Sequence, residues 1–149
     1  MLDVEGGSSP KFAEVLLEAT PQGDRLAVSL VVDVGEYAVS LPDPDHGAWT
    51  SWRAIDPPKT GWINRFLIGQ RELEGNEQAD VVRFKRFGSH VRAATPQEAW
   101  ENFQEMRTQT FNVIQPVGTG GGGVLLIALE SGILRNVSGS LKVRLTRLD

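Results

Sequence analysis

The residues best suited to hold a metal ion are Asp43, Asp45 and His46, which bring two carboxylates and an imidazole into one short segment. A calcium loop needs a further acid before its glycine and a bidentate glutamate later, where this chain has Ala54. The second histidine, His90, is too distant in sequence to complete a helical zinc motif. We therefore expect a solvated turn and no resident metal, although the three residues leave a weak site open.

The glycine-rich run Gly118–Gly123 carries backbone N–H groups that could cradle a phosphate. Phosphate cradles follow a strand and lead into a helix, whose N-terminal N–H groups face the anion. Here the run follows a predicted helix and leads into an apolar strand, and the carbonyl end of a helix repels anions. We expect no cofactor. Gly120 and Gly121 instead suit close approach by the backbone of a neighbouring subunit.

No combination of residues predicts a catalytic centre. The chain contains no cysteine, which excludes thiolate nucleophiles, disulfides and Cys-ligated metals. It lacks the Gly-x-Ser-x-Gly elbow of serine hydrolases, and its carboxylates follow no pattern that would place two on opposite walls of a pocket. We expect no catalytic residues and predict that the protein is not an enzyme.

Three of the four tryptophans, Trp49, Trp52 and Trp62, lie in a proline-rich insertion at about 42–79 where regular hydrophobic patterning stops. Tryptophans in an irregular segment often fix that segment to the core. They also serve as hot spots for protein partners or as platforms for carbohydrate or peptide ligands. Both interpretations remain open at the level of the sequence, and we include the three residues in a candidate subunit contact.

Charge is distributed unevenly along the chain, whose net charge is −4. Residues 1–45 are predominantly acidic and residues 133–149 predominantly basic. Such polarity suits head-to-tail docking of identical subunits, or pairing of the first and last strands within one sheet. For the docking hypothesis we assign the contact to an acidic set and a basic set. These are Glu14, Glu18, Asp33 and Glu36, and Arg83, Lys85, Lys142 and Arg144.

One main helix is predicted at about 96–114. Thr95 can cap its first turn, and Glu98 can complete a capping box. Apolar side chains then recur every three or four residues until Pro116 ends the pattern. A second, short helix could begin at Thr60.

Alternating or continuous apolar runs predict strands elsewhere in the chain. The expected strands are 12–20 and 26–34 as a hairpin, 37–41, 79–92, 124–129, 134–137 and 141–145. In 79–92 we expect Val82 and Phe84 to face inward, with Arg83 and Lys85 on the solvent side. The run 124–129 is apolar on both faces, which is typical of a buried strand.

The predicted fold class is α+β and mostly β: an antiparallel β-sandwich or barrel, with the main helix packed on one side and the long Trp/Pro-rich insertion. Residues 1–10 form a flexible arm, and 11–149 form a single domain. No apolar run is long enough for a membrane span, and the arm lacks the features of a signal peptide.

These expectations favour a non-enzymatic structural subunit whose partners are copies of itself and other assembly subunits. The acidic composition argues against direct sequence-specific nucleic-acid binding, and we expect no membrane partner. In architecture alone, the plan is like small virion proteins of tailed phages: tail or neck subunits, or capsid-cementing proteins. The expected location is the cytoplasm on synthesis and the virion or another assembly when mature. The alternative is a carbohydrate- or peptide-binding β-module.

Overall fold

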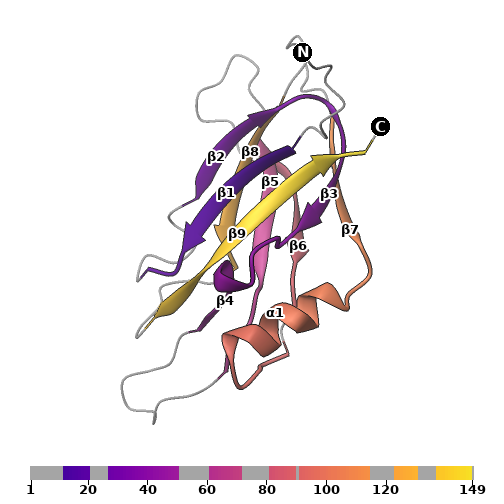
Figure 1. Cartoon of the computed structure of the whole chain (residues 1–149). Helices are drawn as coiled ribbons and strands as arrows, with labels where there is room; N and C mark the ends of the chain where they lie inside the picture. The colour runs from indigo at the N-terminus through magenta and orange to yellow at the C-terminus, as the bar shows by residue number, and fades with distance from the viewer. Residues whose placement is uncertain are drawn as a thin grey trace, which may run out of the picture.

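The computed structural model describes residues 12–20, 27–50, 61–71, 81–89, 91–114, 123–130 and 137–148. Within this part of the chain, the strands form two antiparallel sheets that pack face to face, with the helix α1 at one end (Figure 1). The predicted fold class, a mostly β antiparallel sandwich with one main helix, is confirmed.

Sheet A contains β1, β9, β3 and β7 in spatial order, with β4 also paired to β9. Their bounds are Phe12–Glu18 (β1), Ser138–Arg147 (β9), Gly35–Ser40 (β3), Gln109–Val113 (β7) and Gly47–Thr50 (β4). Sheet B contains β2, β8, β5 and β6 in that order. Their bounds are Val28–Val32 (β2), Gly123–Leu129 (β8), Phe66–Arg71 (β5) and Val81–Phe87 (β6).

The core lies between the two sheets and is built from alternate residues of each strand. Sheet A contributes Val15, Leu17, Tyr37, Val39, Phe111, Val113, Leu141, Val143 and Leu145. Sheet B contributes Phe66, Ile68, Phe87, Leu125, Ile127 and Leu129. Phe66 and Phe87 stack with their ring centroids 5.3 Å apart. The period-two alternation predicted for these strands therefore marks the inner faces correctly in most of them.

The predicted hairpin between 12–20 and 26–34 is wrong. β1 pairs with β9 in sheet A, whereas β2 pairs with β8 in sheet B. The turn signal that suggested the hairpin lies outside the described residues. Both pairings join strands far apart in sequence, so local patterning carries no information about them.

The helix is shorter than predicted: α1 covers Pro96–Gln104, and 109–113 is the strand β7. Thr95 Oγ1 accepts the N–H of Glu98 at 3.1 Å, as expected of the cap, and the Glu98 carboxylate accepts the N–H of Ala94 at 2.9 Å. The misassigned residues are rich in Thr, Phe and Val, which favour strands. Pairing of β7 with β3 overrides the helical spacing.

The insertion at 42–79 is more regular than predicted. It contains the 3-10 helix η2 (Pro44–His46), β4 and β5. The short helix expected near Thr60 is not formed in its described part, because Phe66 and Leu67 belong to β5. Segments 51–60 and 72–80 lie outside the described residues, as does the arm 1–10. The predicted strand 141–145 belongs to β9 (Ser138–Arg147). The predicted strand 134–137 falls almost wholly in residues 131–136, which also lie outside the described residues.

Candidate functional site

The charged residues expected at a subunit contact partly meet one another within the chain. Glu14 and Arg144 are direct partners in the β1–β9 register, and Arg144 Nη2 lies 2.5 Å from Glu14 Oε2. The Arg144 guanidinium also lies over the Phe12 ring, 4.4 Å from its centroid. The sequence-level alternative, in which charges of the first and last strands meet across one sheet, is therefore observed for this pair.

Two further pairs join the acidic and basic sets to other residues of the chain. Arg147 Nη1 lies 3.6 Å from Asp33 Oδ2, and Lys142 Nζ lies 3.5 Å from Asp43 Oδ2. The N–H of Asp45, which donates to Asp43 Oδ1, lowers the pKa of Asp43 below its usual value, and Lys142 adds to the effect. Glu18 and Glu36 are exposed. Contact of these residues with another subunit stays a prediction.

Trp49 and Trp62 fix the insertion to the body of the domain. Trp49 is only 3% exposed, and its indole Nε1 donates to the carbonyl of Arg65 at 3.1 Å. Trp62 is half-buried against a small cluster of alanines and exchanges two backbone hydrogen bonds with Ala93. Trp49 therefore offers no open ring face to a ligand. Trp52 lies outside the described residues.

β6 faces opposite to the prediction. Phe87 is buried, so Lys85, two residues earlier, shares its inward side, whereas Phe84 points outward and is 58% exposed. Lys85 remains exposed because β6 is an edge strand; its Nζ donates to the Thr110 carbonyl at 2.8 Å across the gap between the sheets. Arg83 is described by its backbone alone.

Two predicted sites remain, the possible metal site and the glycine-rich run. Within the described ranges, no group of three or more His, Asp or Glu side chains is arranged to hold a metal ion. His46 Nδ1 is hydrogen-bonded to Ser140 Oγ at 2.6 Å, which orients its ring toward β9. Gly120 and Gly121 lie outside the described part of the chain.

No described helix has the length and apolar character needed to cross a membrane.

The most unusual surface is the outer face of sheet B, which the sequence analysis did not single out. Its outward side chains come from alternate positions of the four strands and are mainly apolar. The described members are Ala27, Ser29, Val31, Leu67, Gly69, Phe84, Arg86, Val124, Leu126 and Ala128. Val31 is 73% exposed. The helix α1 packs against β4 and η2, so it leaves this face uncovered.

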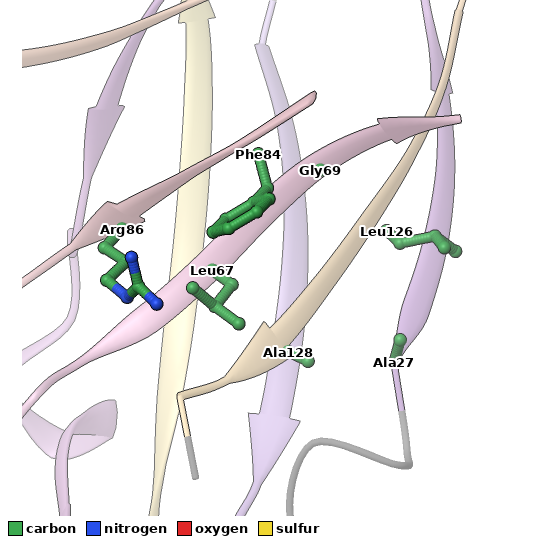
Figure 2. Close-up of a pocket in the computed structure, with 7 residues that line it drawn as sticks. All are labelled: Ala27, Leu67, Gly69, Phe84, Arg86, Leu126 and Ala128. Carbon is green, nitrogen blue, oxygen red and sulfur yellow. The ribbon is translucent and has the colours of Figure 1, made fainter. Parts of the chain in front are cut away.

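A hollow of about 350 Å³ lies in the middle of this face (Figure 2). One row across the sheet runs Phe84, Gly69, Leu126, so a residue without a side chain stands between two large ones. The next row runs Arg86, Leu67, Ala128, and its last member has a small side chain. Gly69 and Ala128 thus form the floor, with Phe84 and Leu67 on one side and Leu126 on the other.

Among the described side chains of this face, charge is confined to one corner; Arg71, paired with Val124 in the register, is described by its backbone alone. Glu130 lies between two guanidinium groups: Arg65 Nη2 and Arg86 Nε are 2.7 Å and 2.6 Å from its Oε2. Arg86 also lies over the Phe84 ring, 5.3 Å from the ring centroid. This arrangement holds the Arg86 head group at the rim and leaves the hollow apolar.

A sequence signal for this face did exist in β8, the run that is apolar on both faces. An antiparallel strand with one solvated face normally alternates apolar and polar residues. In β8 the inward Leu125 and Ile127 belong to the core, but the outward Val124 and Leu126 are half-buried and lie outside the core cluster. The prediction that this run is a strand is confirmed, whereas its outward residues Val124 and Leu126 are only half-buried.

Comparison of the chain with protein-family models, with curated proteins and with solved structures found no match.

Proposed function

We propose that this protein is a non-enzymatic structural subunit of a larger assembly and that it contacts neighbouring subunits through the outer face of sheet B. The observation that carries the proposal is the strand β8, whose residues are apolar on both faces although only its inner residues belong to the core cluster. Contiguous apolar surface of this kind typically marks an interaction site.

The intrachain ion pairs influence which surface serves as the contact. Glu14, Asp33, Lys142 and Arg144 each have an oppositely charged partner within a few ångströms in the same chain. A contact that used these residues between subunits would have to exchange one set of ion pairs for another, with little net gain. The apolar face loses only water on contact, which supports it as the primary contact.

A finer proposal concerns the assembly itself. We propose a virion component of a tailed phage, as a tail or neck subunit or a capsid-cementing protein that is made in the cytoplasm and incorporated into the particle. Its support is architectural analogy: a small two-sheet β-domain braced by one helix, with an uncovered sheet face. An antibody to the chain should label purified particles of the phage that encodes it. Particles that lack the chain would contradict this finer proposal.

The assembly function is tested by light scattering over a concentration series at low and high salt. The monomer mass is 16.3 kDa. We expect a larger mass that rises with concentration and survives high salt, because burial of apolar surface is not screened by ions. A mass of one subunit at every concentration and salt level would contradict self-assembly. Association that disappears at high salt would instead support docking through the charged sets.

A further inference from the structure

We infer that the outer face of sheet B binds the same face of a second copy of this chain, through a two-fold contact that stacks the two sheets. This inference rests on the proposed function and specifies its partner and symmetry. It differs from head-to-tail docking, because in a two-fold contact the same residues serve on both sides.

The shape of the face suits a copy of itself. Phe84, Gly69 and Leu126 form one row across three strands, so a ridge stands on each side of a gap. The hollow above Gly69 and Ala128, about 350 Å³, is wide enough for an apolar side chain of an opposing sheet. The face therefore carries both ridges and a groove, and a two-fold axis would place a ridge of each copy over the groove of the other.

The charge of the face also suits a copy of itself. Glu130 offsets the charge of one of the two guanidinium groups of Arg65 and Arg86, and these groups lie at a corner. Ser29 supplies a neutral polar group opposite Leu126 in the register. Arg86 is the one described charged side chain that lines the hollow, and it is already paired with Glu130. A second copy therefore meets limited like-charge repulsion over the hollow.

The size of the face predicts a weak contact. Strands of about six residues at ~3.3 Å each, in four rows ~4.8 Å apart, give a face of about 400 Å². Two copies would then bury about 800 Å², which is below the ~1,200 Å² of stable specific complexes. We therefore expect a dissociation constant in the micromolar range, which suits a contact that is repeated many times in an assembly.

Phe84→Glu tests the contact, and Leu16→Glu is its matched control. Both side chains are large, apolar and exposed, at 58% and 43%, but Leu16 lies on the outer face of sheet A. Sedimentation equilibrium should show at least about tenfold weaker self-association for Phe84→Glu and an unchanged constant for Leu16→Glu. Thermal unfolding of both variants verifies that each is folded.

Single-cysteine variants give a second readout, because the natural chain contains no cysteine. Ser29→Cys places a thiol on the outer face of sheet B, and Leu16→Cys places one on the outer face of sheet A. A short bis-maleimide should yield covalent dimers of Ser29→Cys and few of Leu16→Cys.

The outcomes separate the two proposals. The wild-type protein could associate while Phe84→Glu leaves the association unchanged and Ser29→Cys gives no cross-linked dimer. That result would overturn the two-fold contact but leave the assembly function standing. A wild-type protein that stays monomeric at about 1 mM would overturn the two-fold contact and self-assembly together, because even a micromolar contact would be saturated there. Slow maleimide labelling of Ser29→Cys in a monomer would show that another segment of the same chain covers the face, which also overturns the two-copy contact.

Discussion

The side-chain amide of Gln70 hydrogen-bonds to both main-chain groups of Ile114 and thereby joins the two sheets. Gln70 lies in β5 with its side chain turned toward the core and is 1% exposed, whereas Ile114 directly follows the edge strand β7. The N–H of Ile114 donates to Gln70 Oε1 at 3.0 Å, and Gln70 Nε2 donates to the carbonyl of Ile114. The amide thus acts as a strand partner at an edge that would otherwise need one.

Replacing this amide should destabilise the fold. Gln70→Met keeps most of the side-chain volume but leaves the N–H and C=O of Ile114 without these partners. We expect the free energy of unfolding to fall by about 1–3 kcal/mol in urea denaturation. The control is Gln97→Met on the exposed surface of α1, where the glutamine pairs only with Glu101 and a change of a few tenths of a kcal/mol is expected. Equal losses in both variants would contradict the role of Gln70.

Asn64 should be equally important at the other end of β5. It is fully buried; its Nδ2 donates to the Ala99 carbonyl in α1 at 2.8 Å, and its Oδ1 accepts the N–H of Ser89 at 2.7 Å. Asn64→Ala removes both bonds and should cost about 2–4 kcal/mol of unfolding free energy. Gln97→Ala on the exposed surface of α1, where the amide pairs with Glu101, is the comparison and should cost much less. A loss below about 1 kcal/mol for Asn64→Ala would show that water replaces the amide.

The Glu14–Arg144 pair should contribute a small, salt-sensitive coupling. A double-mutant cycle with Glu14→Gln and Arg144→Met should give about 0.2–1 kcal/mol at low salt, because both side chains are about one-third exposed. The coupling should shrink in 1 M salt, where the Debye length is ~3 Å. Self-association should be unchanged in both single variants if sheet B provides the contact. Loss of association in either variant would restore the docking role predicted for these residues.

Asp43 should titrate at a lower pH than an ordinary aspartate, because the N–H of Asp45 and, next, Lys142 favour its charged form. Its pKa is lower in the folded than in the unfolded state, so the carboxylate stabilises the fold above the unfolded pKa. That contribution is lost as the pH falls through the folded pKa.

A carbon-detected NMR titration measures the Asp43 pKa directly. The stability difference between wild type and Asp43→Asn should be present at neutral pH and shrink below about pH 4. Lys142→Gln should raise the Asp43 pKa only partly, because the backbone hydrogen bond remains. An Asp43 pKa at or above that of a reference peptide would contradict the geometry.

Local patterns in the sequence determined much of the fold. Strict alternation identified β2 and β3, and the Thr95 cap located the start of α1. Patterning failed where two periods fit the same residues. Phe111 satisfied the helical spacing from Trp100, but it also alternates with Val113, and the partner strand β3 decided for the strand. Likewise, strand pairing across the sandwich joins β1 to β9, which no turn signal encodes.

The candidate site shows the same division. By itself, the sequence determined that β8 is apolar on both faces and that β6 carries two phenylalanines, Phe84 and Phe87. Because side chains alternate, residues three apart cannot share a face, and only packing could choose which one is buried. Stacking of Phe87 on Phe66 turned Phe84 outward, across the gap at Gly69 from Leu126. The tertiary structure therefore decided that the uncovered face of sheet B is apolar, because a strand's exposure depends on which elements pack against it.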